Sequence, residues 1–251
     1  MDKEELKRLA KSDKYIPGIY NYCDRWCEKC SYTKKCLSFE MSKSQFDSNI
    51  SINNKKFWTD LEKSFGVVKE LLNDYMEEYG IEPPSEEDNS KIEIEMKRVD
   101  EYVKSDPIIK ESRLYTKVSG ELLKEYDYFS NSFNTATKDK DKLEQIGNLQ
   151  EAIEIILFYN SLIFVKLSRA LHAYYSNDVN DATGMEEDQL VSARIALSAV
   201  EKSMGAWHFI LDNFDTNTDK VADIILHLNQ IKLGVETTIP KVVGYKRPYF
   251  D

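Results

Sequence analysis

The chain has 251 residues, of which 41% are apolar and 31% charged, and its formal net charge is −10. This composition is typical of a soluble globular protein that is long enough to bury a full core. The excess of acidic residues argues against nucleic acid as a partner, because such binding depends on Lys and Arg neutralising phosphates. With only nine glycines and six prolines, an all-β fold is disfavoured, since it needs a turn about every 8–12 residues.

No segment is expected to enter a membrane. The opening residues 1–8 are rich in charge and contain no apolar stretch, so we expect neither a secretory signal nor an anchor there. The longest uncharged run, residues 155–165, is shorter than the roughly 20 residues that span a bilayer. These features predict a cytoplasmic protein, in a compartment where thiols stay reduced.

Residues 1–40 form the first predicted module, and its main feature is a group of four cysteines. They fall within fourteen residues, and the rest of the chain contains none. Cysteines that only fill a core scatter singly along a sequence, so this concentration predicts one metal site. A Pro17-Gly18 turn precedes it, and five aromatic residues around it would shield a small centre. The predicted ligands are Cys23, Cys27, Cys30 and Cys36, and the aromatic residues are Tyr20, Tyr22, Trp26, Tyr32 and Phe39.

The spacing of the cysteines, C-x3-C-x2-C-x5-C, fits either a [4Fe–4S] cluster or a single Zn²⁺ ion. Structural zinc sites commonly join two ligand pairs through a longer loop, whereas clusters often take their ligands from one short segment. The spacing therefore favours the cluster slightly. Two disulfides are the weaker explanation in a reducing compartment, and unliganded or redox-active cysteines remain the alternative to a metal site.

Three of these residues, Cys23, Cys27 and Cys30, reproduce a C-x3-C-x2-C pattern that resembles the cluster motif of radical S-adenosylmethionine enzymes. That resemblance implies three cysteine ligands and one iron open to the cofactor. It covers eight residues, and the chain lacks the alternating strands and helices of that family's barrel. Cys36 would also supply a fourth ligand, so the family's activity is not expected.

Cys27, Cys30 and Cys36 resemble the C-x2-C-x5-C part of the iron–sulfur site in RecB-like nucleases. In that family the three cysteines follow the nuclease core, whereas here they precede the rest of the chain. The only trace of an acidic-x-Lys motif is Glu95-Met96-Lys97, where helical spacing predicts a solvated charged face. Nuclease activity is therefore not expected.

The remaining segments predict an all-α fold, a bundle of about five to six helices with the cysteine module at its N-terminal end. Residues 41–54 are polar and read as a connection, and residues 55–234 carry the bundle. Apolar residues at helical spacing predict helices from Phe57 to Tyr79 and from Ile92 to Val103. A third begins at Pro107, with Asp106 as its cap, and its pattern continues to Phe133.

The second half of the bundle contains the strongest helical pattern, from Asp141 to Tyr175. This stretch is apolar on nearly all sides, which predicts the central helix. A capping box from Thr183 to Glu186 precedes another helix that reaches Phe214, and its small residues should allow close packing. The last helix is predicted to end at Gly234, leaving residues 235–251 as an extended tail.

The bundle offers few groups for chemistry. Its histidines are His172, His208 and His227, and helical spacing allows Glu201 to share a face with His208, and Asp223 with His227. Carboxylates and histidines on one helix face resemble the ferritin-like plan, but the Glu-x-x-His pairs of that plan are missing. Polar or hydrogen-bonded histidines are therefore the better explanation. Asn160, Ser161 and His172 would either line a small pocket or form a structural network.

These observations lead to a metal-binding helical protein with an accessory, binding or electron-transfer role, for which a protein partner is an open option. The alternative is a redox enzyme whose iron–sulfur centre lies beside a pocket in the bundle, with Asn160, His172 or His208 facing the substrate. A third option is a structural zinc module that holds the N-terminal segment in place. Catalytic residues and oligomeric state are not indicated by the sequence.

Overall fold

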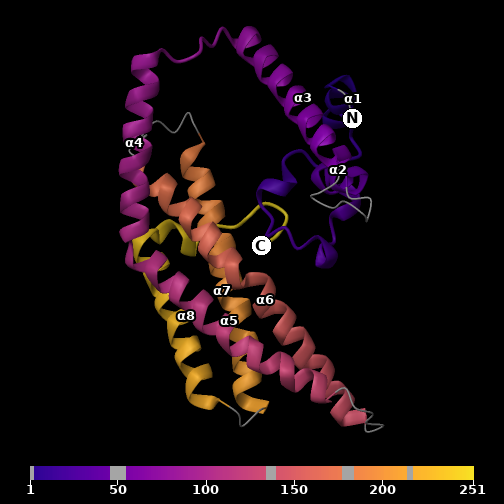
Figure 1. The fold of residues 1–251 in the computed structure, drawn as a ribbon, viewed down its shortest axis with the longest axis vertical. Coiled ribbons are helices and arrows are strands. Elements are labelled where there is room, and N and C mark those ends of the chain that lie inside the picture. Colours follow the sequence, from indigo (N-terminus) through magenta and orange to yellow (C-terminus); the bar gives the residue numbers. More distant parts are fainter. Residues whose placement is uncertain (1–2, 46–54, 134–139, 177–183, 214–216) are drawn as a thin grey trace. The chain divides into compact units, whose positions relative to one another are not determined.

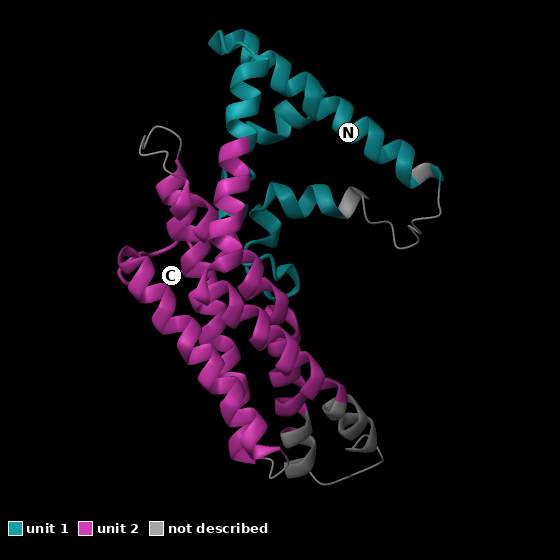
Figure 2. Cartoon of the chain, turned by 60° about the vertical axis from the view of Figure 1, so that its left-hand side comes forward, with its two compact units in different colours: residues 1–93 teal, residues 94–251 magenta. Residues whose placement is uncertain are grey.

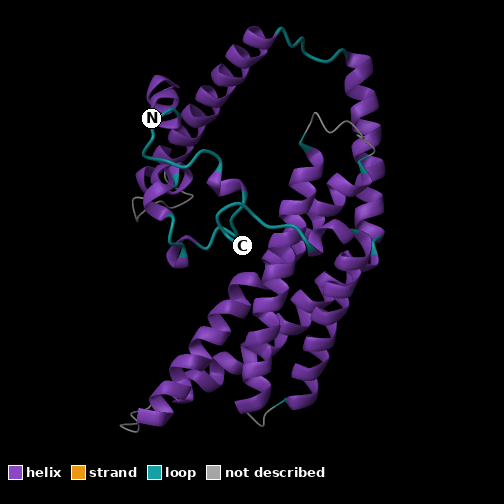
Figure 3. Cartoon of the chain, turned by 180° about the vertical axis from the view of Figure 1, so that it is seen from behind, coloured by secondary structure: helices purple, strands orange, loops and turns teal. Residues whose placement is uncertain are grey.

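The computed structural model describes residues 3–45, 55–133, 140–176, 184–213 and 217–251. Within these ranges the chain forms eight α-helices and no strand (Figures 1 and 3). The predicted all-helical fold is therefore confirmed, with more helices than the five or six expected. The segment from Ile92 to Val103 lies within a helix, as predicted.

The chain divides into two compact units, residues 1–93 and residues 94–251 (Figure 2). The first contains α1 (Lys3–Ala10), α2 (Leu37–Gln45), α3 (Lys55–Tyr79) and the beginning of α4 (Glu86–Ser105). It therefore includes α3, which the sequence analysis placed in the bundle. Helix α2 also occupies residues 41–45, where a connection was expected, and residues 46–54 lie outside the described residues.

The second unit is built on four long helices, α5 (Pro107–Phe133), α6 (Lys140–Tyr175), α7 (Met185–Asn213) and α8 (Thr218–Thr238). Helix α5 contacts α6 and α8, and α7 contacts the same two, so the four helices close into a bundle. Successive helices are joined by short connections, which is the arrangement of an up-and-down bundle. Large side chains fill the centre, including the fully buried Tyr115, Tyr159, Ile163 and Trp207.

Helix α7, not α6, is the most enclosed helix of the bundle. Twelve of its residues are buried, whereas α6 exposes Leu157 and Val165 by more than half. The expectation that the stretch from Asp141 to Tyr175 is the central helix is therefore wrong. The small residues explain why, because they let neighbouring helices approach α7 closely on several sides. They are all buried, as predicted: Ala193, Ala196, Ala199, Ser203 and Ala206.

The start of α5 agrees with its predicted cap. The carboxylate of Asp106 accepts a 2.7 Å hydrogen bond from the backbone N–H of Ile108, and Pro107 is the first helical residue. An N-cap side chain of this kind pairs a backbone donor that the helix itself leaves free. The predicted capping box before α7 cannot be compared in the same way, because Thr183 lies outside the described residues.

The end of α8 differs from the prediction. The helix continues past Gly234 to Thr238, and a 3-10 turn follows at Pro240–Val243, so the tail is not extended from residue 235. Gly234 serves packing instead: a Cβ placed there would lie 2.8 Å from Cγ1 of Ile108 on α5. The glycine therefore lets α8 approach α5, which no local signal in the sequence reveals.

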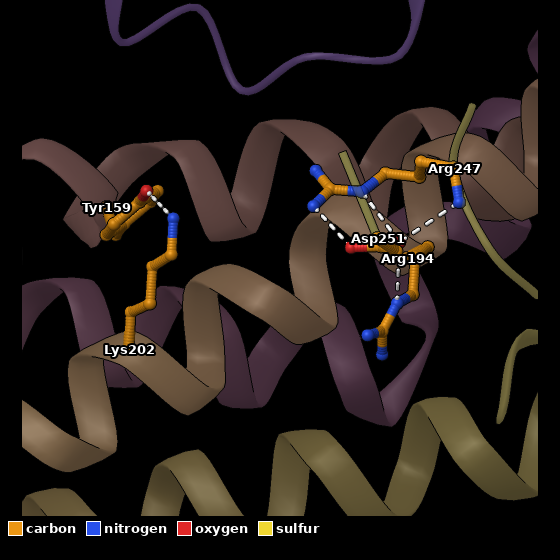
Figure 4. Close-up of polar contacts among 5 residues, drawn as sticks. All are labelled: Tyr159, Arg194, Lys202, Arg247 and Asp251. Atoms are coloured by element: carbon orange, nitrogen blue, oxygen red, sulfur yellow. Dashed lines mark hydrogen bonds and ion pairs between the residues drawn. The ribbon is translucent and has the colours of Figure 1, made fainter. Parts of the chain in front are cut away.

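The last residues of the chain are held against α7 by charge. Asp251 accepts hydrogen bonds from Arg247 at 2.8 and 3.0 Å and from Arg194 of α7 at 3.2 Å (Figure 4). Arg247 is only 8% exposed. Figure 4 also shows Lys202 of α7 donating a 2.8 Å hydrogen bond to the hydroxyl of Tyr159 on α6.

Candidate functional site: the cysteine loop

The segment that carries the cysteines is a loop closed by one backbone hydrogen bond. The N–H of Ile16 donates to the carbonyl of Lys35 at 3.0 Å, which brings the two ends of the loop together. Gly18 has a φ of +67°, the left-handed conformation that glycine adopts at little cost, so the predicted Pro17-Gly18 turn is confirmed. The loop contains three short 3-10 turns: Ile19–Asn21, Cys27–Lys29 and Thr33–Lys35.

Each cysteine lies at the first residue of one of these turns or shortly after its last residue. Cys27 begins the second turn and Cys30 follows its end, while Cys36 follows the third turn and Cys23 lies two residues after the first. All four are free thiols and all are half-buried. Disulfides, the weaker explanation at the sequence level, are absent among these four described residues.

Two of the sulfurs accept backbone hydrogen bonds in the same local pattern. The N–H of Tyr32 donates to Sγ of Cys30 at 3.4 Å, and the backbone of Arg25 donates to the sulfur of Cys23. In both cases the donor is two residues after the cysteine. Donors aimed at a sulfur stabilise its thiolate form, which is the form that binds metals.

The four thiols are close enough to influence one another. Burial raises the pKa of Cys27, and the neighbouring Cys23, Cys30 and Cys36 raise it further. Burial likewise raises the pKa of Cys23, against the lowering effect of its hydrogen bond from Arg25. The loop thus gathers the predicted ligands into one neighbourhood. Among the described residues, however, no group of three or more Cys, His, Asp or Glu is arranged to hold a metal ion.

Aromatic rings and cations surround the loop. Trp26 is 8% exposed, and the Nζ of Lys29 lies 4.6 Å from its ring centroid. The guanidinium of Arg25 lies 5.7 Å from the ring centroid of Tyr20 and donates a 3.0 Å hydrogen bond to Oγ of Ser38. Of the five aromatic residues expected to shield the site, Trp26 is buried and the other four are half-buried.

A cavity of about 580 Å³ adjoins the loop within the first unit. Tyr20 and Arg25 line it on either side of Cys23 in the sequence, and Leu37 and Ser38 follow Cys36 directly. Helices α1 and α3 contribute Leu6, Ala10 and Leu71, which make the walls mostly apolar. The sequence does not reveal this cavity, because its walls come from four separate segments that no local pattern connects.

Two of the three polar residues singled out in the bundle, Asn160 and His172, make structural contacts, and the third, Ser161, is exposed. The hydroxyl of Ser119 donates to Oδ1 of Asn160 at 2.9 Å, and that of Thr116 donates to the carbonyl of Asn160 at 3.0 Å, so this cluster joins α5 to α6. His172 bonds Asp100 through Nε2 at 2.9 Å and the carbonyl of Ser168 through Nδ1 at 2.7 Å.

The other two histidines are a hydrogen-bonded and an exposed polar residue, which was the preferred explanation. His227 lies 2.5 Å from Glu111 of α5, while Asp223 is exposed. His208 and Glu201 are both exposed, and Glu201 instead accepts a hydrogen bond from Lys232. The partners of His227 and Glu201 thus come from neighbouring helices, which spacing along one helix does not indicate.

The fragment Glu95-Met96-Lys97 lies on α4, and all three of its residues are exposed. Glu95 forms a two-pronged ion pair with Arg98, and Met96 is 66% exposed. The prediction of a solvated charged face agrees with this arrangement.

Comparison with known proteins adds no relative, since no family model, curated protein or solved structure matches the chain. In the part of the chain that the structure describes, no helix combines the length and the apolar character needed to cross a bilayer.

Proposed function

We propose that Cys23, Cys27, Cys30 and Cys36 bind one metal centre, either a [4Fe–4S] cluster or a Zn²⁺ ion, and that the protein is a metal-binding accessory or electron-transfer protein. The observation that carries this proposal is that four free, half-buried thiols share one closed loop. Thiolates are the preferred ligands of both centres. Binding would draw the four sulfurs together and release their protons.

The surroundings of the sulfurs support the same proposal. The backbone donors from Tyr32 and Arg25 would stabilise negative charge on Cys30 and Cys23. Arg25 and Lys29 would offset part of the net charge of a tetrathiolate site. The ring of Trp26 would limit the access of water to the centre, which for a cluster influences the reduction potential.

Anaerobic purification followed by metal analysis and an absorption spectrum tests the proposal directly. A cluster predicts a brown protein with about four irons per chain and a broad band in the visible range, whereas zinc predicts a colourless protein with about one zinc. A protein with neither metal, even after reconstitution with iron and sulfide or with zinc, would refute the proposal.

A cysteine variant with a matched control assigns the metal to this loop. Cys30→Ser is expected to lose most of the bound metal, because one of four ligands becomes a hydroxyl that binds soft metals poorly. Ser31→Ala changes the exposed neighbouring residue and is expected to retain the metal. Equal metal content in both variants would place the centre elsewhere.

Hydrogen exchange then shows whether the metal centre stabilises only the cysteine loop or the whole chain. Loss of metal in Cys30→Ser should accelerate amide exchange in residues 15–40, while α5 to α8 keep their protection because their own core holds them. Loss of protection throughout the chain would show that the separation of the two units is wrong.

The cavity beside the loop favours one second candidate, a redox enzyme that uses the centre. Arg25 provides a cation in a mostly apolar wall, and among the described residues it contacts a ring and a hydroxyl but no carboxylate. Such a cavity suits a small apolar molecule with an anionic end. Octanoate is a suitable calorimetric probe; binding that Arg25→Met weakens and Lys29→Met does not would support this candidate, and absence of binding would count against it.

A further inference from the structure

Helix α3 carries an exposed apolar seam with a strict coiled-coil period. Successive members are three and four residues apart in regular alternation, so they occupy the a and d positions of three heptads. This period of 3.5 residues is typical of a helix that pairs with another along its whole length. The α3 seam consists of Trp58, Leu61, Phe65, Val68, Leu72, Tyr75 and Tyr79.

Most of the seam faces solvent. Phe65 is 66% exposed, Val68 58% and Leu72 56%, and Trp58, Tyr75 and Tyr79 are each more than half exposed. Monomeric soluble proteins seldom expose a continuous apolar surface of this kind, and a large one marks an interaction site.

The contacts that α3 makes within its own unit use a different side of the helix. Asp74 accepts 2.7 Å hydrogen bonds from Lys3 and Lys7 of α1, and Leu71 lines the cavity with residues of α1 and α2. In the heptad these two residues are at positions c and g, on one flank of the seam. Helix α1 is thus held in place while the a and d positions stay open.

From this geometry we infer that the α3 seam pairs with the α3 seam of a second copy of the chain, with the two helices antiparallel. The exposed charges on α3 are mixed in the first part of the helix, whereas the second part is mostly acidic. The first part carries Lys55, Asp60, Glu62 and Lys63, and the second Lys69, Glu70, Glu77 and Glu78. A parallel pair would place the two acidic parts side by side. An antiparallel pair places each acidic part beside the mixed part of the other copy, and it also opposes the two helix dipoles.

Charges beside the seam select one register. When Phe65 packs opposite Val68 of the second copy, Glu62 comes next to Lys69 of that copy on the same flank, and the two-fold symmetry creates this pair twice. Both residues are at e positions, which face each other only in an antiparallel pair. Both are exposed, and among the described residues neither makes an ion pair within its own chain.

Sedimentation of the full-length protein under reducing conditions, over a range of about 1–100 μM, tests the pairing. We expect a concentration-dependent dimer, with a limiting mass of twice 29.2 kDa. Phe65→Glu places a charge in the middle of the seam and should weaken the dimer at least 100-fold. Thr59→Glu adds the same charge at an exposed b position and should leave the dimer intact. Circular dichroism of both variants checks that they retain their helices.

A charge exchange tests the orientation and the register. Glu62→Lys alone should weaken the dimer several-fold, because it puts two lysines together at each pair. Glu62→Lys combined with Lys69→Glu should restore the affinity. A monomer at the highest concentration, an assembly that Phe65→Glu leaves unchanged, or a double variant as weak as the single one would each overturn the inference.

Discussion

The hydroxyl of Tyr175 donates a 2.8 Å hydrogen bond to Oδ2 of Asp106, whose other carboxylate oxygen caps α5 through the N–H of Ile108. One buried carboxylate therefore fixes the start of α5 and ties it to the last residue of α6. Asp106 is 5% exposed. A buried carboxylate that satisfies two donors in separate helices is a point where a single substitution should be costly.

We expect Asp106→Ala to lower the free energy of unfolding by about 2–3 kcal/mol, since it removes a helix cap and leaves the Tyr175 hydroxyl without its acceptor. Asp106→Asn keeps an oxygen for the cap and should cost less. Urea unfolding followed by circular dichroism gives both values. Asp223→Ala, an exposed aspartate on α8, is the control and should change stability by less than about 0.5 kcal/mol. Equal effects at positions 106 and 223 would refute the role of Asp106.

The same contact predicts a change in stability at alkaline pH. Burial, together with the carboxylate of Asp106, raises the pKa of Tyr175 to about 12, whereas a tyrosine in the unfolded chain titrates near 10. The protonated hydroxyl is favoured by folding, so its contribution is complete below about pH 10 and is lost as the pH rises towards 12. The difference in melting temperature between the wild type and Tyr175→Phe should therefore shrink in this range. A constant difference would contradict the raised pKa.

The structural features that were predicted correctly from the sequence depend on only a few neighbouring residues. The Asp106-Pro107 start of α5 and the Pro17-Gly18 turn depend on the backbone of the next one or two residues, so the sequence contains the whole cause. Gly234 shows the limit of such reasoning. Its role is set by the close approach of Ile108, which lies more than a hundred residues away along the chain.

The candidate site could be predicted only in part for the same reason. The four cysteines are local to one segment, and the structure places them in one loop as half-buried free thiols. The cavity beside them, in contrast, takes its walls from α1, α2 and α3, and His227 finds its partner on α5. The central helix was assigned to α6 because it has many large apolar residues, but enclosure depends equally on small residues, as in α7.

Tyr115 and Tyr159 make an informative pair for mutation, because both are buried but only the hydroxyl of Tyr159 joins two helices through a hydrogen bond. The Tyr115 hydroxyl, Oγ of Ser203 and Nε1 of Trp207 are all buried, and in the described part of the chain none of them makes a hydrogen bond of good geometry. Tyr159 accepts one from Lys202. Tyr115→Phe should leave the free energy of unfolding unchanged or raise it by up to about 1 kcal/mol, while Tyr159→Phe should lower it by about 1 kcal/mol. Urea unfolding that ranks the two variants the other way would show that the Tyr115 hydroxyl is bonded.

Asn160 is expected to act in packing and not in binding. Its side chain accepts from Ser119 and donates to the carbonyl of Thr116 at 3.4 Å, so Asn160→Ala should lower the free energy of unfolding by about 2 kcal/mol. Asn148→Ala changes an exposed asparagine of the same helix and should be nearly neutral. Metal content should be the same in both variants. A loss of bound metal in Asn160→Ala with unchanged stability would instead connect this residue to the centre.

The contact between Asp251 and Arg247 predicts a change in stability at acidic pH. Burial by itself would raise the pKa of Asp251, but hydrogen bonds from Arg247 and Arg194 outweigh it and hold this pKa well below its ordinary value. The ionised carboxylate is favoured by folding, so its contribution is present above about pH 4 and is lost as the pH falls below that value. We expect Asp251→Asn to lower the free energy of unfolding by about 1–2 kcal/mol at pH 7, and by progressively less between about pH 4 and pH 2. Thermal unfolding of both proteins across this range measures the difference, and a gap that stays constant or widens on acidification would contradict the lowered pKa.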